Sequence, residues 1–163
     1  MSSEGVLESI RAFLKYSGVD FVEKHHPPTF TSEESAHARG EPLAIGAKAL
    51  VIKTDDRYRL FVLPADRKID SQAIKRHLGA KKLRFATADE LHHLTSLPPG
   101  SVPPFGPPIL PLELFADEAL GRNDRIAFNA GSLTTSIVMP FADYRRVSGA
   151  CWLEFSQPNQ AAI

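Results

Sequence analysis

A proline-dense segment constrains the fold of this chain more than any other feature of its sequence. Residues 97–108 read LPPGSVPPFGPP, and six of these twelve residues are proline. Proline has no backbone N–H and its ring clashes with the preceding helical turn, so the segment is excluded from helices and from central strands. The rings also restrict the backbone, which predicts a stiff, shaped loop rather than a flexible linker.

This loop retains backbone N–H groups between its prolines, at Gly100, Ser101, Val102, Phe105 and Gly106. A rigid loop that presents such groups outward can hold a carbonyl oxygen or an oxyanion without any charged side chain. The turn at 131–132 offers a similar resource, because glycine permits close approach of a ligand and serine adds a hydroxyl. The alternative for both segments is an ordinary structural turn.

Hydrophobic periodicity and capping residues predict helices and strands on both sides of the loop. Helices are expected at residues 4–16, at 32–38 with Thr31 or Ser32 as the cap, at 71–78 with Ser71 as the cap, at 88–95 with Thr87 and Glu90 as a capping box, and at 141–147. Strands are expected at 19–23, 47–52, 58–64, 82–86, 109–116, 125–129 and 135–139, the second and third forming a hairpin. This mixture predicts an α+β or mixed α/β fold, and the absence of a dividing linker predicts one domain over residues 1–163.

Lys48 is a single charge within an otherwise apolar run, residues 47–52. Alternation along a strand places Lys48, Leu50 and Ile52 on one face. Where that face points inward, burial of the ammonium is unfavourable unless a partner or ligand compensates the charge. A functional pocket is then the sharper interpretation, and a lysine at the entrance of the strand with its ammonium in water is the other.

Basic residues concentrate in one part of a chain whose formal net charge is zero. Between Asp66 and Arg84, seven lysines and arginines stand against two aspartates. Such a cluster can contact phosphate groups without the whole protein being basic. A solvated helix face is the alternative that charge alone favours.

Familiar catalytic and metal-binding patterns are missing from the sequence. Cys151 is the single cysteine, and its place beside Trp152 favours a packed thiol in the core over a nucleophile. The adjacent pairs His25–His26 and His92–His93 lack the spacing of a helical zinc site. We therefore expect no metal and no cofactor, and a reaction that needs few side chains.

No segment reads as a secretory signal or a membrane span. The N-terminus lacks a basic region followed by an apolar one, and no run approaches about 18 apolar residues. We expect a cytoplasmic protein without a membrane partner.

Six segments in a fixed order give the chain a resemblance to a known family. They are His26–Thr29, the strand with Lys48, Leu63–Asp70, Leu83–Thr87, Gly100–Gly106 and Phe128–Leu133. Together they resemble the YbaK family of aminoacyl-tRNA deacylases, which is related to the editing insertion of bacterial prolyl-tRNA synthetase. The likeness extends from about His25 to Val147.

The resemblance implies an α+β domain with a mixed β-barrel-like sheet core surrounded by helices. It also implies hydrolysis, in trans, of the ester that joins a wrong, small amino acid to the 3′ acceptor end of tRNA. Lys48 matches the family's essential lysine and is expected to be catalytic. The expected substrate-binding residues are Phe30, Thr31, Gly100, Ser101, Val102, Pro103, Gly106, Gly131 and Ser132. Some relatives carry a histidine near Gly131, whereas this chain has no histidine after His93.

The expected mechanism combines positioning with oxyanion stabilisation by loop amides, while a free hydroxyl of the terminal ribose assists the attacking water. Phe30, Thr31 and Ala47 are candidates for setting which amino acid fits. Expected partners are aminoacyl-tRNA and an aminoacyl-tRNA synthetase, and not DNA. Two alternatives stand beside this one: a non-catalytic tRNA- or synthetase-binding module that retains the fold, and a small-molecule esterase, which the missing nucleophile and base weaken.

Overall fold

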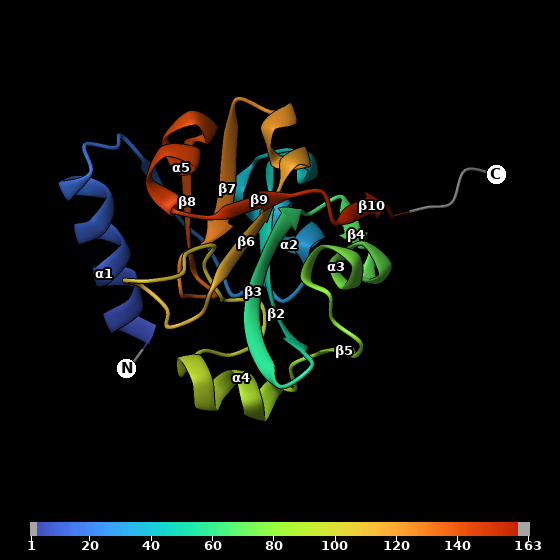
Figure 1. Ribbon diagram of the computed structural model, residues 1–163. Coiled ribbons are helices and arrows are strands. Elements are labelled where there is room, and N and C mark those ends of the chain that lie inside the picture. Colours follow the sequence, from blue (N-terminus) through green and yellow to red (C-terminus); the bar gives the residue numbers. More distant parts are fainter. Residues whose placement is uncertain (1–2, 160–163) are drawn as a thin grey trace.

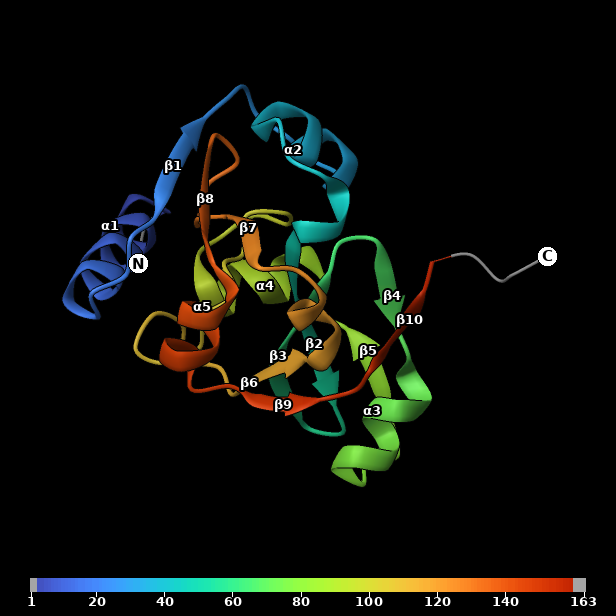
Figure 2. The ribbon, with the colours of Figure 1, turned by 90° about the horizontal axis from the view of Figure 1, so that it is seen from above.

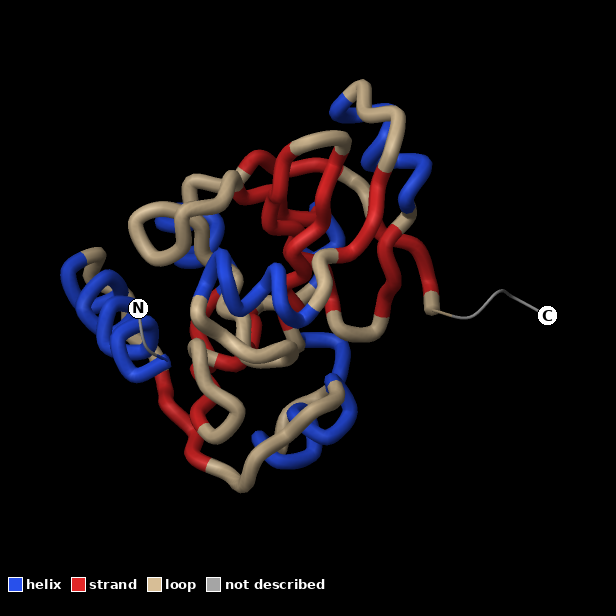
Figure 3. The backbone as a smooth tube through the Cα atoms, turned by 90° about the horizontal axis from the view of Figure 1, so that it is seen from below, coloured by secondary structure: helices blue, strands red, loops and turns tan. Residues whose placement is uncertain are grey.

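The computed structural model describes residues 3–159, which form an arrangement of strands with helices around them (Figure 1). The helices are α1 (Ser3–Tyr16), α2 (Ser32–Arg39), α3 (Ser71–Leu78), α4 (Ala88–Thr95) and α5 (Phe141–Ser148), with short 3₁₀ turns η1 (Leu43–Ile45) and η2 (Glu118–Arg122). The strands are β1 (Val22–His25), β2 (Ala47–Thr54), β3 (Arg57–Pro64), β4 (Arg67–Ile69), β5 (Leu83–Phe85), β6 (Leu114–Asp117), β7 (Arg125–Asn129), β8 (Thr135–Pro140), β9 (Cys151–Leu153) and β10 (Ser156–Pro158). The helices lie outside the strands, as the view from below makes plain (Figure 3).

The strands form three sheets. The largest has the order β5-β2-β3-β6-β9, with antiparallel pairing at β2–β3 and parallel pairing at β3–β6 and β6–β9. A second sheet has the order β1-β8-β7, and β4 and β10 pair by themselves beside α3 (Figure 2). An isolated parallel bridge between Gly46 and Ala127 connects the two larger sheets. The expected α+β class, with a mixed sheet core and surrounding helices, is confirmed.

Alternation along β3 divides the core between the two faces of the large sheet. Leu60 and Val62 belong to one hydrophobic cluster, whereas Phe61 and Leu63 belong to the other. Neighbouring side chains on a strand point to opposite faces, so one strand supplies both clusters. All four side chains are fully buried.

Several sequence expectations are confirmed and others are corrected. The β2–β3 hairpin and the Thr87–Glu90 capping box form as predicted. Ser71 does not cap α3: the side chain of Asp70 accepts the Ala73 N–H, because Asp70 is the residue just before the first helical turn. The sulfur-bearing Cys151 is exposed rather than packed in the core, because β9 is the outer strand of its sheet.

The strand expected over residues 109–116 is shorter than its apolar run. Only Leu114–Asp117 form β6, and the segment before it is a turn in which the N–H groups of Ile109 and Leu110 both donate to the Gly106 carbonyl. Pro111 lacks the N–H that a ladder requires, so it keeps this segment out of the sheet. The early strand also starts later than expected, at Val22, because the Val19 N–H still donates to Leu14 at the end of α1.

Candidate active site

A cavity of about 150 Å³ lies where the start of β2 meets the start of α2 and the proline-rich loop. Its walls come from five separate parts of the chain. They are Phe30, Thr31, Ser32, Ser35, Arg39, Gly46, Ala47, Lys48, Ala49, Leu50, Ala65, Gly100, Val102 and Asn129. Two of these residues are cationic and none is acidic, which favours a ligand atom that carries negative charge.

An open strand edge explains why the cavity forms here. Strand β5 pairs only with Ile52–Thr54 of β2, so residues 47–50 have a strand neighbour only on the β3 side. These four residues line the cavity. Unpaired strand edges expose backbone N–H and C=O groups, so this wall offers the ligand polar backbone atoms as well as side chains.

Lys48 is half-buried on the part of β2 that β5 leaves unpaired, and it lines the cavity. Among the described residues its ammonium has no hydrogen-bond or ion-pair partner. Burial lowers the pKa of Lys48 below its ordinary value of 10.5, while the more distant charges of Glu33 and Asp66 oppose that shift. A partly desolvated ammonium without a protein partner is available to a ligand, as the sequence pattern suggested.

The proline-rich loop is fixed against the cavity by contacts from distant elements. The Asn129 side-chain amide, at the end of β7, donates to the Gly100 carbonyl at 2.6 Å. The hydroxyl of the buried Tyr144, in α5, donates to the Pro104 carbonyl at 2.7 Å. Directly after Pro104, the ring of Phe105 packs edge-to-face against Phe128 and Tyr144. The loop is therefore held near its start, at Gly100, and in its middle, at Pro104 and Phe105.

Two amides of this loop are free to bind a ligand. Gly100 and Val102 line the cavity, and neither N–H has a hydrogen-bond partner within residues 3–159. Gly100 has φ +87°, a left-handed conformation that glycine adopts without strain. Ser101, between them, is fully buried, and its hydroxyl and N–H both donate to the Pro98 carbonyl.

A buried network behind the cavity was not predicted from the sequence. Arg39, only 8% exposed, donates from Nε to the Ser136 hydroxyl at 2.8 Å and from Nη2 to Asn129 Oδ1 at 3.0 Å. The Ser136 hydroxyl donates to the same Asn129 oxygen and is hydrogen-bonded to His26 Nε2. Desolvation lowers the pKa of Arg39 to about 10, so its guanidinium stays charged at neutral pH.

This network connects Arg39 to the proline-rich loop through a single side chain. Asn129 accepts from Arg39 on its oxygen and donates from its nitrogen to Gly100. The sequence contained little signal for the role of Arg39, because a basic residue in the last turn of a helix ordinarily interacts with the helix dipole. Asn129 lies inside the segment Phe128–Leu133 that carried the family resemblance, but nothing local indicated its partners.

The structure brings some of the expected site residues together and leaves others elsewhere. Lys48, Phe30, Thr31, Gly100 and Val102 all line the cavity. The side chain of Phe30 is 69% exposed at its rim, and the Thr31 hydroxyl accepts the Glu34 N–H as the cap of α2.

The remaining expected residues are outside the cavity wall, namely Ser101, Pro103, Gly106, Gly131 and Ser132. Gly106 and Gly131 allow close packing, since an added Cβ would lie 2.6 Å from the Leu112 carbonyl oxygen and 2.6 Å from Val6 Cγ1 respectively. Pro103 is buried, and the Ser132 hydroxyl accepts the Thr134 N–H within its own turn. The structure thus gives these residues a part in shaping the loops, and their contact with substrate stays a prediction.

Metal-binding clusters and membrane-spanning helices are both absent from residues 3–159. No cluster of three or more histidine, cysteine, aspartate or glutamate side chains is placed to hold a metal ion within that range. Of the helices in that range, none combines the length and the apolar character that crossing a bilayer requires.

Comparison with known proteins identifies a family over most of the chain. A family model described as the aminoacyl-tRNA editing domain matches residues 26–147. This range includes every residue that lines the cavity.

Individual relatives agree with that match. The Multifunctional Ser/Thr-tRNA deacylase ProXp-y of Escherichia coli K12 is 36% identical over 143 residues, which are 84% of this chain and 84% of the relative. The Prolyl-tRNA editing protein ProX of Acetoanaerobium sticklandii is 24% identical and covers 86% of this chain and 88% of the relative. A crystal structure described as the hypothetical protein APE2540 has the same fold, with a TM-score of 0.79 at 22% identity over 91% of this chain and 99% of that one.

Proposed function

This chain belongs to the aminoacyl-tRNA editing domain family, and on that premise we propose that its cavity hydrolyses the ester bond of tRNA mischarged with a small amino acid. The chain is an aminoacyl-tRNA deacylase that acts in trans, and its substrate partner is aminoacyl-tRNA. The observation that carries the site assignment is that half-buried Lys48 lines the same cavity as the amides of Gly100 and Val102, and that none of these three groups has a partner among residues 3–159. We assign the whole of residues 1–163 to one functional domain.

Lys48 supplies positive charge where the ester develops negative charge. Its ammonium orients the terminal nucleotide and the ester, and its attraction is strengthened by partial desolvation. The Gly100 and Val102 amides are the candidate donors to the tetrahedral oxyanion, and a well-placed donor of this kind contributes about 3–4 kcal/mol. The stiff loop keeps these donors in position before substrate arrives, so little reorganisation is needed during the reaction.

The reaction consumes one water and needs no side-chain nucleophile. Water attacks the ester carbonyl carbon, a C–O bond forms, and the carbonyl oxygen becomes an oxyanion. Collapse of the tetrahedral species breaks the bond to the ribose oxygen, which takes a proton and leaves as the free hydroxyl of tRNA. The neighbouring ribose hydroxyl accepts one water proton as it passes its own proton to the leaving ribose oxygen, and the released amino acid loses the second water proton to solvent and becomes a carboxylate.

The size of the cavity supports selection of small amino acids. A volume of about 150 Å³, lined by Ala47, Ala49 and Ala65, has room for a side chain such as that of alanine, serine or threonine. One methylene discriminates by only about 1–3 kcal/mol in a synthetase, so small wrong residues pass and a second, steric site must remove them. The relative from Escherichia coli is named for Ser/Thr-tRNA deacylation, which agrees with this size class.

We assign the protein to the cytoplasm, where charged tRNA and the synthetases occur. Relatives that are domains of proline–tRNA ligases support a synthetase as a further partner. One of them, from Shouchella clausii, is 34% identical over 104 residues, which are 64% of this chain and 18% of the ligase.

A deacylation panel tests the proposed function. Purified protein is incubated with Ala-, Ser-, Thr- and Cys-charged tRNA and with a bulky control such as Phe-charged tRNA, and release of the amino acid is measured over the spontaneous rate. We expect hydrolysis of at least one small aminoacyl-tRNA and none of the bulky one. Binding of tRNA without hydrolysis of any member would instead identify a non-catalytic tRNA-binding module.

A further inference from the structure

A second cavity adjoins the first, and its wall is mostly apolar. It measures about 170 Å³ and shares Ala49, Leu50, Gly100 and Val102 with the cavity of Lys48. The rest of its wall comes from β2, from β5 and the residues that follow it, from α4 and from the proline-rich loop. Those residues are Val51, Phe85, Ala86, Thr87, Ala88, Leu91 and Pro99.

Phe85 is the most conspicuous member of this wall, because its side chain is 54% exposed. A ring this exposed is accessible to a ligand, and exposed aromatic rings are the stacking surfaces on which single-stranded nucleic acids place their bases. A dry cavity of about 150 Å³ already accommodates a benzene ring, so the second cavity has room for the ring of a base. Shape, polarity and an aromatic wall therefore suit a nucleobase.

The backbone that carries Phe85 is held rigidly. The guanidinium of Arg84 donates to both carboxylate oxygens of Glu90, at 2.7 and 2.8 Å. Glu90 also accepts the Thr87 N–H in the capping box of α4 and the hydroxyl of Tyr58. Phe85 is thus presented by a turn that is fixed on both sides, which lowers the entropic cost of binding a ligand on its ring.

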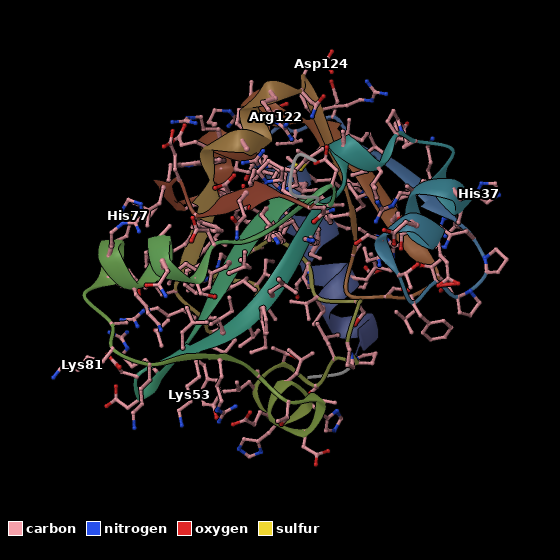
Figure 4. The ribbon with its side chains drawn as sticks, turned by 90° about the vertical axis from the view of Figure 1, so that its right-hand side faces the viewer. His37, Lys53, His77, Lys81, Arg122 and Asp124 are labelled. Atoms are coloured by element: carbon pink, nitrogen blue, oxygen red, sulfur yellow. The ribbon has the colours of Figure 1, made fainter. Side chains whose placement is uncertain are left out.

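Three lysines lie at the same end of the molecule. Lys81 and Lys82 immediately precede β5, and Lys53 of β2 is in register with Arg84. Lys53 and Lys81 extend outward at this end (Figure 4), and none of the three lysines has an ion-pair partner within residues 3–159. A backbone that leaves the second cavity in this direction would meet cationic side chains, as the phosphates of a nucleic acid require.

We propose that the second cavity binds the base of the 3′-terminal nucleotide of tRNA, stacked on Phe85. The inference rests on the proposed function, because the ester in the first cavity is attached to the ribose of that same nucleotide. One sugar separates the ester from the base, and the two cavities share four wall residues. The adjoining cavities therefore match the covalent order of the substrate: amino acid, ribose, base.

Steady-state deacylation of a mischarged tRNA tests this assignment with three variants of Phe85. Loss of one stacked base corresponds to about a tenfold or larger loss of affinity, so Phe85→Ala raises KM by about tenfold and leaves kcat within about twofold. Phe85→Trp retains the wild-type KM because it keeps a π-face, whereas Phe85→Leu, which is apolar but not aromatic, resembles Phe85→Ala. Tyr16→Ala is the matched control, since Tyr16 is an aromatic residue 94% exposed on α1 and outside both cavities.

A KM of Phe85→Ala within twofold of the wild-type value would overturn the inference while the deacylase assignment stands. Binding of an uncharged acceptor minihelix, with and without its terminal nucleotide, separates the two assignments further. The inference predicts that removing the nucleotide weakens binding to the wild type but not to Phe85→Ala. Equal loss in both proteins would show that the base does not stack on Phe85, whether or not the panel detects hydrolysis.

Discussion

Lys48 and Arg39 face the same cavity, and no acidic side chain lines it. The two cations are held in different ways. Arg39 is satisfied by the neutral oxygens of Ser136 and Asn129, whereas Lys48 has no partner among the residues that the structure describes. Charges buried without counter-ions are unfavourable, so stability alone does not explain this pair, and an anionic or oxyanionic ligand does.

Asn129 connects Arg39 to the proline-rich loop through its two hydrogen bonds, and Asn129→Asp tests that role. The substitution keeps the acceptor for Arg39 but removes the N–H that donates to the Gly100 carbonyl, and it places a carboxylate against that carbonyl. We expect kcat/KM for deacylation to fall by about tenfold or more, because a displaced loop loses its oxyanion donors. The free energy of unfolding should change much less, since Arg39 gains an ionic partner.

Asn123→Asp is the matched control for this prediction. Asn123 also donates its side-chain amide to a backbone carbonyl, that of Ala44, but it does not line the cavity. Deacylation by this variant should match the wild type. If Asn129→Asp were equally active, the loop would not need its anchor.

At the residue scale, the sequence predicts a functional residue when the residues next to it in the chain make it unusual. Lys48 was identifiable because a charge inside an apolar, β-branched run has few explanations. Arg39 and Asn129 were not, because their significance comes from partners 90 residues apart in the chain. Ser101 has a hydroxyl like any ligand-binding serine, and only the fold shows that the hydroxyl bonds to Pro98.

The elements that build the site are held by long-range contacts to the proline-rich loop. The loop has no ladder of its own, so its position depends on Asn129, on Tyr144 and on the packing of Phe105. Tyr144 is fully buried, and burial raises the pKa of its hydroxyl well above the ordinary value. It therefore remains a neutral donor to Pro104 over the whole physiological range.

Tyr144→Phe should lower the free energy of unfolding by about 1–2 kcal/mol, because the Pro104 carbonyl then stays buried without a donor. Urea denaturation followed by fluorescence or circular dichroism measures this loss. Tyr58→Phe is the control, since its hydroxyl bonds to Glu90, which keeps Arg84 and Thr87 as partners. An equal effect of the two substitutions would show that the bond to Pro104 has no special weight.

At the element scale, helix caps and the hairpin were predictable, whereas strand limits were not. The Thr87–Glu90 box is a local signal and forms as expected. The apolar residues Ile109 and Leu110 predict a strand but form a turn, because burial in a turn and burial in a sheet favour the same apolar side chains. The open edge of β2 depends on where β5 stops pairing, which no local pattern records.

Over the whole molecule, ion pairs connect the segments that surround the cavity. Glu41 joins β1 to β7, since its carboxylate lies 3.3 Å from Lys24 Nζ and 2.9 Å from Arg125 Nη2. The hydrogen bond from Arg125, and then that from Lys24, holds the pKa of Glu41 below its ordinary value of 4.5. The stabilisation is therefore present above pH 4.5 and is lost as the pH falls through the lower, folded-state pKa.

Glu41→Gln tests this contribution. At pH 7 the variant should be less stable than the wild type by about 0.5–1 kcal/mol, and the difference should shrink as the pH falls through the lowered folded-state pKa of Glu41 and the wild-type carboxylate takes a proton. Thermal unfolding across this pH range measures both effects. Glu113→Gln removes a more exposed partner of Arg59 and should change stability less at every pH. A deficit of Glu41→Gln that stayed constant as the pH falls below 4.5 and the wild-type carboxylate takes up its proton would contradict the account.

The sequence predicts the fold class of the whole molecule but not how its segments are placed around the cavity. Alternating hairpins and helices indicated α+β, and ordered motifs indicated the family. Two features depend on tertiary structure and leave no local pattern in the sequence. They are the bridge from Gly46 to Ala127 and the meeting of five chain segments around one cavity. The same is true of Gly131, which packs on Val6 and does not line the cavity.

The central claim is that one desolvated ammonium beside a rigid amide-presenting loop sustains ester hydrolysis. Deacylation by Lys48→Ala, measured beside Lys68→Ala on the tRNA that the wild type hydrolyses best, tests it most directly. Lys68 is an exposed lysine of β4 outside the cavity, so its variant should retain full activity. Lys48→Ala should lose at least about 90% of kcat/KM, which corresponds to about 1.4 kcal/mol of transition-state stabilisation. Full activity of Lys48→Ala, with an unchanged fold, would contradict the account.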